Sequence, residues 1–144
     1  MCLFDEVDFV QTQNLPISEL WAFLPLGYLV TILIETPVLL FALPTRIPVR
    51  QRLWCGAWLT ACTYPIVVLV LPAIFLGQSR ALYLLVAEVF APVAECLLFW
   101  FAFRGRERIK TNDWVRCYIA VVIANLASFG LGEVLNNYGW FGLF

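Results

Sequence analysis

Four long stretches of the chain are almost entirely apolar, and polar residues gather in the short segments between them. The apolar stretches cover about residues 20–43, 53–77, 81–103 and 114–135. A helix that crosses a bilayer needs about 20 mostly apolar residues, and each stretch meets that length. Because the connections are short, neighbouring helices should pack antiparallel. The pattern predicts an all-α integral membrane protein whose four-helix transmembrane bundle covers residues 19–136.

The two ends of the chain do not fit a membrane span. Residues 1–18 carry acidic and polar side chains and lack a basic start, which argues against a cleaved signal peptide. We expect this segment to lie outside the cytoplasm, either as a short helix on the membrane surface or as a disordered tail. Residues 137–144 form an aromatic C-terminal tail.

The composition supports the same class of protein. The chain is 62% hydrophobic and 13% charged, whereas soluble domains are about 45–50% apolar and about 25% charged. Its mean hydropathy is +0.86. We therefore expect the lipid bilayer to be its main surrounding, and a chain of this size favours a homo-oligomer or a larger membrane complex.

The nine Lys and Arg residues are distributed unequally between the two sides of the bundle. The basic loops 44–52 and 104–113, with nearby Arg116, hold all of them except Arg80. Cytoplasmic loops carry an excess of basic residues, so we expect both basic loops to be cytoplasmic and both termini to lie outside. A bacterial inner membrane is the simplest location.

The basic loops are also candidates for contact with lipid head groups. Anionic lipids attract clusters of Lys and Arg beside a membrane span, and the candidates here are Arg46, Arg50, Arg104 and Arg106. The alternative is that these charges only set the orientation. Glu107 and Asp113 dilute the cluster, so we expect no nucleic-acid partner.

A shift of the chain by 60 residues aligns similar residues. Glu35 then falls on Glu95, and the same shift pairs Arg46 with Arg106 and Trp54 with Trp114. The matches favour two duplicated helical hairpins related by an axis along the membrane normal. The alternative is that interfacial tryptophans and basic loops recur in any pair of membrane hairpins.

Three glutamates lie inside the apolar stretches, far from any loop: Glu35, Glu88 and Glu95. The chain has no histidine to pair with them. A carboxylate at the centre of a membrane helix costs about 2.5–3.5 kcal/mol on insertion scales, so such residues are candidates for function. Glu35 and Glu95 precede their basic loops by the same distance and should share one layer. Glu88 should point to the same side of its helix as Glu95, nearer the outside.

Other polar residues fall at similar depths. Asn125 and Ser128 share one face of the fourth helix, with Ser128 at the depth of Glu88 and Asn125 between the two layers. Thr60 and Thr63 add hydroxyl groups on the second helix. The acids could be protonated, could hydrogen-bond as neutral groups, or could hold a cation. Oxygen ligands suit protons, alkali ions, Mg²⁺ or Ca²⁺. The alternative is that the polar groups only join the helices. No motif identifies a cofactor or a metal.

Three prolines lie beside these polar residues. Pro37 and Pro65 each follow a polar residue, Glu35 and Thr63, by two positions, and Pro92 lies between Glu88 and Glu95. An internal proline removes a helical hydrogen bond and bends the helix. Broken helices near intramembrane polar groups are common in transporters. The alternative is that prolines are simply tolerated in membrane helices.

Two functions remain in competition. The first is a small transport or channel component for protons or a hard cation, using Glu35, Glu88, Glu95, Asn125, Ser128 and Thr63. The second is a non-catalytic membrane subunit or assembly factor that binds a protein, lipid, quinone or pigment. An intramembrane enzyme is a third reading, since paired carboxylates can perform acid–base chemistry. However, no nucleophile motif or phosphate-binding loop accompanies them.

Overall fold

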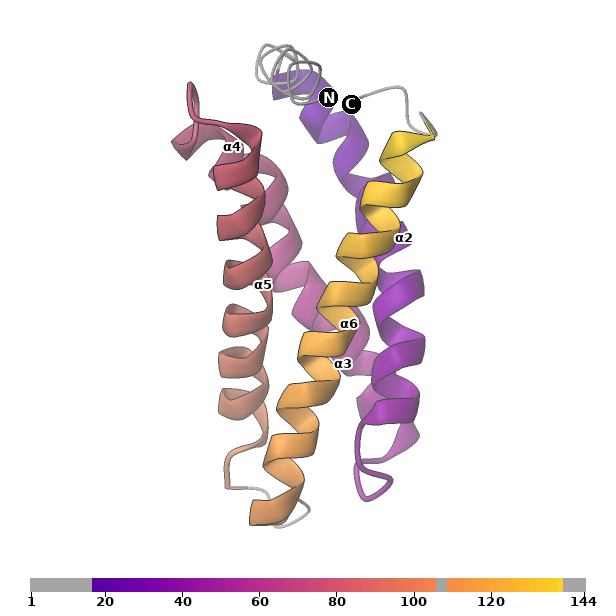
Figure 1. The fold of residues 1–144 in the computed structure, drawn as a ribbon. Helices are drawn as coiled ribbons and strands as arrows, with labels where there is room; N and C mark the ends of the chain where they lie inside the picture. Colours follow the sequence, from indigo (N-terminus) through magenta and orange to yellow (C-terminus); the bar gives the residue numbers. More distant parts are fainter. Residues whose placement is uncertain (1–16, 106–108, 139–144) are drawn as a thin grey trace.

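The computed structural model describes residues 17–105 and 109–138 (Figure 1). Within them the chain is helical and contains no strand, with the elements α2 (Ile17–Ala42), α3 (Val49–Pro65), η1 (Ile66–Val70), α4 (Leu71–Ile74), α5 (Arg80–Phe103) and α6 (Thr111–Asn137). Four helical segments are long and apolar enough to cross a membrane: Trp21–Ala42, Val49–Ile74, Arg80–Phe103 and Thr111–Leu135. The predicted all-α class with four such helices is confirmed for this part of the chain.

The helices begin earlier than the apolar pattern predicted. α3 starts at Val49, because Pro48 precedes it and its carbonyl accepts from the N–H groups of Gln51 and Arg52. α6 likewise starts at Thr111. Hydropathy marks only the apolar part of a helix, whereas backbone hydrogen bonding continues into a polar first turn. Arg50 and Arg52 therefore lie on a helix instead of in a loop. Residues 1–16, Arg106 and residues 139–144, which carry other sequence predictions, lie outside the described residues.

The four helical segments pack in a ring. α2 packs against α3 and α6, and α5 packs against the same two helices. The α2–α3 and α5–α6 connections lie at one end of the bundle, while the start of α2, the turn before α5 and the end of α6 lie at the other (Figure 1). Neighbours along the chain are antiparallel, as predicted from the short connections. Each hairpin thus contributes two adjacent helices to the ring.

Two glycines allow the chain to turn sharply. Gly77 and Gly105 both have a φ angle of +80°, in the left-handed region that side chains with a Cβ avoid. Gly77 lies in the turn before α5, where the Ser79 hydroxyl accepts from the Leu82 N–H at 3.3 Å and caps the helix. Gly105 follows the last residues of α5, a usual place for a left-handed glycine.

Pro65 marks a change in the second membrane-length segment. α3 ends there and is followed by the wider turn η1, in which the Leu71 N–H donates to the Ile66 carbonyl five residues earlier. The Tyr83 hydroxyl on α5 donates to the Val67 carbonyl at 3.1 Å. A proline has no backbone N–H group to donate to the helix. Wider helical turns often occur where the regular α-helical hydrogen-bond pattern is interrupted. α2 and α5, in contrast, continue through Pro37 and Pro92.

The buried apolar residues gather on the side of the bundle near the basic loops. Leu39 and Phe99 occupy equivalent places on α2 and α5, four residues after Glu35 and Glu95, and both are buried. Phe99 stacks on Phe103 with ring centroids 4.5 Å apart. This core holds the two hairpins together directly beside the buried glutamates.

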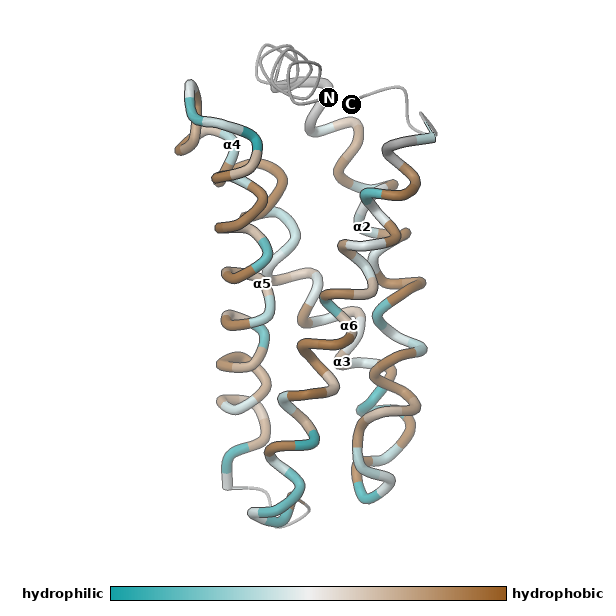
Figure 2. Tube along the Cα trace, viewed as in Figure 1, coloured by the Kyte–Doolittle hydropathy of each residue, from teal (hydrophilic) through white to brown (hydrophobic). Residues whose placement is uncertain are grey.

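The outer surface of the bundle is apolar. Leu33 is 72% exposed and Phe41 is 79% exposed, and further large apolar side chains are exposed along the other helices. Figure 2 shows hydrophobic residues along the lengths of the helices and hydrophilic residues mainly near their ends. Continuous apolar surface of this kind marks contact with a membrane or with other proteins.

Candidate functional site

Glu35 on α2 is buried in the centre of the ring and joins three helices. It is 2% exposed. Its Oε2 atom lies 2.6 Å from the Thr60 hydroxyl on α3, and its Oε1 atom lies 2.7 Å from the Ser128 hydroxyl on α6. Both carboxyl oxygens are therefore hydrogen-bonded within the protein, each to a different helix.

Glu95 on α5 has a matching environment. It is 1% exposed. Its Oε1 atom lies 2.7 Å from the Thr63 hydroxyl on α3, and its Oε2 atom accepts from the Asn125 amide on α6 at 2.7 Å. These contacts and those of Glu35 define a polar layer, which consists of Glu35, Thr60, Thr63, Glu95, Asn125 and Ser128.

The hydrogen bonds of the polar layer cross between the hairpins. Each glutamate is bonded to one residue of its own hairpin, Thr60 for Glu35 and Asn125 for Glu95. Each is also bonded to the residue one helical turn further along the opposite hairpin, since Ser128 contacts Glu35 and Thr63 contacts Glu95. All four membrane-length helices are thus joined in one place. The sequence-based expectation that Glu35 and Glu95 share a layer agrees with this geometry.

Two different numbers of positions separate the corresponding residues of the two hairpins along the chain. The glutamates are related by 60 positions, as the sequence comparison indicates. Their partners Thr60 and Asn125 are related by 65 positions. The partner in the second hairpin therefore follows its glutamate by 30 positions, whereas the partner in the first follows by 25. A single shift of 60 aligns Trp54 with Trp114 but misses the hydrogen-bonding residues.

The polar layer contains two carboxyl groups, and their partners are side chains on α3 and α6. Over residues 17–105 and 109–138, no group of three or more His, Cys, Asp or Glu residues is arranged to hold one. No Lys or Arg is hydrogen-bonded to Glu35 or Glu95 either; their partners are hydroxyl and amide groups. This arrangement joins the four membrane-length helices through the two carboxyl groups.

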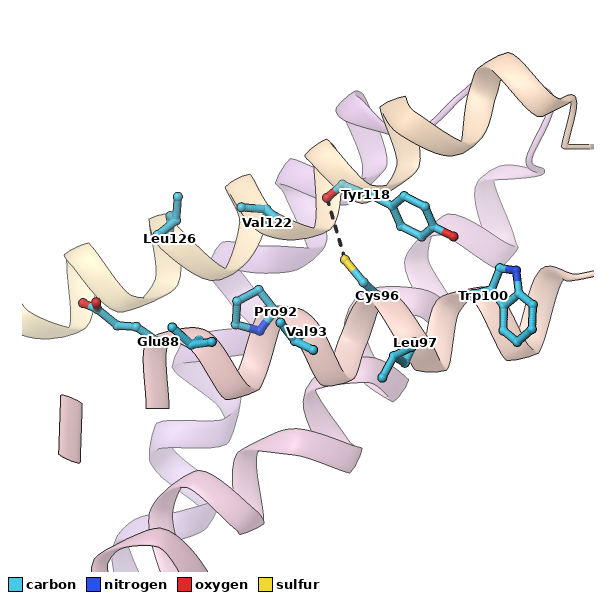
Figure 3. A pocket seen from close by; sticks show the side chains of 10 residues that line it. Glu88, Pro92, Val93, Cys96, Leu97, Trp100, Tyr118, Val122 and Leu126 are labelled. Atoms are coloured by element: carbon cyan, nitrogen blue, oxygen red, sulfur yellow. Dashed lines mark hydrogen bonds between the residues drawn. The ribbon is translucent and has the colours of Figure 1, made fainter. Parts of the chain in front are cut away.

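Glu88 does not belong to the polar layer. It is half-buried and lines a groove of about 680 Å³ between α5 and α6, together with Val89, Pro92, Val93, Cys96, Leu97, Trp100, Tyr118, Val122 and Leu126 (Figure 3). Ser128, which the sequence places at the same depth as Glu88, is bonded to Glu35 instead. No hydrogen bond or ion pair to Glu88 is present in the described part of the chain. We call this feature the Glu88 groove.

At the place that corresponds to Glu88, the two helices of the first hairpin are joined by a hydrogen bond. Tyr28 stands at the position equivalent to Glu88, and its hydroxyl donates across to the Ala57 carbonyl on α3 at 2.8 Å. Gly56 allows α2 and α3 to approach closely, because a Cβ there would lie 2.9 Å from the Thr36 Cα atom. The residue equivalent to Gly56 in the second hairpin is Val121, which is buried. The two hairpins therefore differ in the residues at these two positions.

The basic residues mostly contact the protein itself. Arg46 forms a 2.9 Å ion pair with Asp113, and the Arg116 guanidinium donates to the Ala42 carbonyl at 2.8 Å, so the two hairpins are also joined at their loop ends. The Arg104 guanidinium lies 4.8 Å from the centre of the Trp100 ring. Of the predicted head-group residues, Arg50 is exposed, and Arg106 lies outside the described residues.

At the opposite end of the bundle, Arg80 pairs with Glu133. The shorter of the two contacts between the guanidinium and the carboxylate is 2.9 Å. The pair connects the start of α5 to the end of α6, and it accounts for the one basic residue found at this end.

Comparison of the chain with protein-family models, with curated proteins and with solved structures gave no significant match. The function is therefore inferred from the residues and their geometry.

Proposed function

We propose that this protein is a non-catalytic integral membrane subunit that receives a transmembrane helix of a partner protein in the Glu88 groove. One observation supports this most directly. Glu35 and Glu95 are saturated by internal hydrogen bonds, whereas Glu88 faces an apolar groove and has no partner among residues 17–105 and 109–138. A carboxyl group at membrane depth is costly when it lacks a partner. A hydrogen-bond donor or a cation supplied from outside the chain would satisfy it.

The shape of the groove favours a helix as the occupant. It follows α5 from Glu88 to Trp100, which is about 18 Å of helix at ~1.5 Å per residue. It lies between two helices, where a third helix packs its side chains between theirs. Polar side chains often join helices in membranes, so the partner should carry a polar or basic residue opposite Glu88. A lipid, quinone or pigment in the groove is the alternative occupant.

Site-specific photo-crosslinking tests this proposal. A photoreactive residue replaces Val93 in the groove. In the matched control it replaces Leu33, which is the equivalent position on the first hairpin and is also exposed. In native membranes we expect one defined protein adduct from position 93, none from position 33, and loss of the adduct in Glu88→Leu. Equal products from both positions, or adducts of lipid alone, would contradict the proposal.

Movement of a proton or a hard cation is the second candidate function. The observation that favours it is the meeting of Glu35 and Glu95 in one layer, where Asn125 contacts both Glu95 and Ser128. Flux across liposomes that contain the purified protein, measured with and without Glu95→Gln, tests it. Flux that is absent, or that the substitution leaves unchanged, would reject transport through this layer.

We also infer that the basic loops face the cytoplasm of a bacterial inner membrane and that both termini lie outside. The position of both loops at one end of the bundle supports this orientation, since basic residues are retained on the cytoplasmic side (Figure 1). A membrane-impermeant thiol reagent should label Gln78→Cys from outside and Lys110→Cys only from inside, in a background where the native cysteines are replaced. The reverse pattern would invert the orientation.

Duplication of the hairpin is a further part of the proposal. It is supported by the crossed hydrogen bonds of the polar layer, in which each residue of one hairpin has a counterpart in the other. Buried Leu39 and Phe99 are related by the same 60 positions as the glutamates. Internal repeats related by an axis along the membrane normal are known among membrane proteins.

A further inference from the structure

The Thr60 hydroxyl has more oxygen neighbours than it has protons to share. Its Oγ1 atom lies 2.6 Å from Glu35 Oε2 and 2.7 Å from the Gly56 carbonyl oxygen. Both distances are typical of O–H···O hydrogen bonds, which require a proton between the two oxygens. A hydroxyl carries one proton, and a carbonyl carries none. The second proton has to come from the Glu35 carboxyl group.

The other oxygen of Glu35 has a similar neighbour. Ser128 Oγ lies 2.7 Å from Glu35 Oε1 and 2.9 Å from the Asn125 carbonyl oxygen. If Glu35 were ionised, the two hydroxyls would have to serve four oxygen contacts with two protons. A proton on Oε2 lets Glu35 donate to Thr60, lets Thr60 donate to Gly56, and leaves Ser128 free to donate to Oε1. Only the longest of the four contacts then lacks a proton.

Glu95 shows the same arrangement around Thr63. The Thr63 Oγ1 atom lies 2.7 Å from Glu95 Oε1 and 3.2 Å from the Leu59 carbonyl oxygen. The Asn125 amide has two protons, which it donates to Glu95 Oε2 and to the Val121 carbonyl. A proton on Glu95 Oε1 supplies the one that Thr63 needs to reach both of its neighbours.

In the described part of the chain, no Lys or Arg is paired with either glutamate. The titratable group that faces Glu35 is Glu95 on α5, and those near Glu95 are Glu35 on α2 and Cys96 on its own helix. α3 and α6 present only hydroxyl and amide groups to the pair. Two ionised carboxylates here would be like charges in a medium of low dielectric constant, which makes that state costly.

We infer that Glu35 and Glu95 form a two-proton binding site, in which each is a neutral acid that donates to a threonine on α3. One proton is on Glu35 Oε2 and the other is on Glu95 Oε1. Each acid donates to a threonine hydroxyl, which in turn donates to a backbone carbonyl of α3. Because the two acids interact, they release protons as a coupled pair. Loss of a proton leaves one threonine contact without a donor and so weakens the attachment of α3. This inference goes beyond the proposed partner and does not depend on the Glu88 groove.

Infrared difference spectroscopy of the purified protein in lipid nanodiscs tests the site. A protonated carboxyl group has a C=O band that an ionised one lacks. We expect this band near neutral pH, a partial loss in Glu35→Gln, a partial loss in Glu95→Gln and a larger loss in the double variant. Glu88→Gln is the matched control, because it removes a membrane glutamate while the bands of Glu35 and Glu95 remain.

A second variant tests the site without removing either acid. Thr60→Val deletes the acceptor of the Glu35 proton, so the Glu35 band should move to higher wavenumber while the Glu95 band stays in place. The proposal fails if the folded glutamine variants keep the full wild-type band, or if Thr60→Val leaves the band unmoved. If the carboxyl band is missing but the crosslink from position 93 forms, the proton site alone is rejected. If the band is present but the crosslink does not form, the partner alone is rejected.

Discussion

Thr60 and Glu35 are joined by a hydrogen bond of 2.6 Å that connects α3 to α2 at a fully buried position. Thr60→Val keeps the size of the side chain and leaves a buried carboxyl oxygen without this partner. An unsatisfied buried group costs about 1–3 kcal/mol, so the variant should lose stability of that order. Unfolding in mixed detergent micelles measures the change. Thr31→Val is the control, because Thr31 bonds only to Gly27 on its own helix, and a change there as large as at Thr60 would contradict the prediction.

Glu95 should tolerate glutamine but not leucine. A glutamine side chain offers one acceptor and one donor, so it can keep its bonds to Asn125 and Thr63. Leucine removes both partners at once and leaves the Asn125 amide with one bond fewer. We expect a loss within about 1 kcal/mol for Glu95→Gln and about 1–3 kcal/mol for Glu95→Leu. Thermal unfolding in detergent compares the two, and equal losses would show that the hydrogen bonds of Glu95 do not stabilise the bundle.

Gly56 and Gly132 should respond in opposite ways to alanine. A Cβ at Gly56 would lie 2.9 Å from the Thr36 Cα atom, whereas nothing lies within 4 Å of one at Gly132. Gly56→Ala should separate α2 from α3 and cost about 1–3 kcal/mol, the usual effect of overpacking. Gly132→Ala should stabilise helix α6 by about 0.5–1 kcal/mol. Chemical unfolding of both variants measures the two changes in stability. If Gly56→Ala does not lower the stability, the close approach of α2 and α3 is not required.

Glu88 should be dispensable for folding. Because Glu88 has no hydrogen bond to any residue that the structure describes, Glu88→Leu should leave the unfolding midpoint in detergent unchanged or raised. Tyr28→Phe, at the equivalent position of the other hairpin, removes a bond to the Ala57 carbonyl. That change should cost about 0.5–1.5 kcal/mol. If Glu88→Leu destabilised the isolated protein as much as Tyr28→Phe, Glu88 would be a structural residue and the groove would lose its main support.

Part of the polar layer could be predicted because depth along a helix follows directly from residue number. Glu35 and Glu95 lie at equal distances from their loops, so counting residues was sufficient to put them in one layer. The same counting failed for Glu88. Its spacing from Glu95 places both on a similar face, but the partners available at each level depend on how α6 and α3 approach α5. Ser128, expected at the depth of Glu88, is bonded to Glu35 instead.

The correspondence between the residues of the two hairpins also required the three-dimensional structure. A linear shift assumes one spacing for both helices of a hairpin, and the tryptophans favoured 60 positions. The partners of the glutamates, Thr60 and Asn125, correspond at 65. Hydrogen bonds depend on where side chains meet in space, so the number of residues between two partners can differ between the hairpins while the contacts stay equivalent.

The sequence by itself determined that the chain forms four membrane-length helices with basic residues mostly between paired helices, because length, hydropathy and charge are properties of each segment alone. Only the tertiary structure decided which glutamates are saturated and which one is left facing a groove. That decision depends on distances of a few ångströms between side chains on different helices, such as the 2.6 Å between Thr60 and Glu35, and no local pattern in the sequence contains those distances.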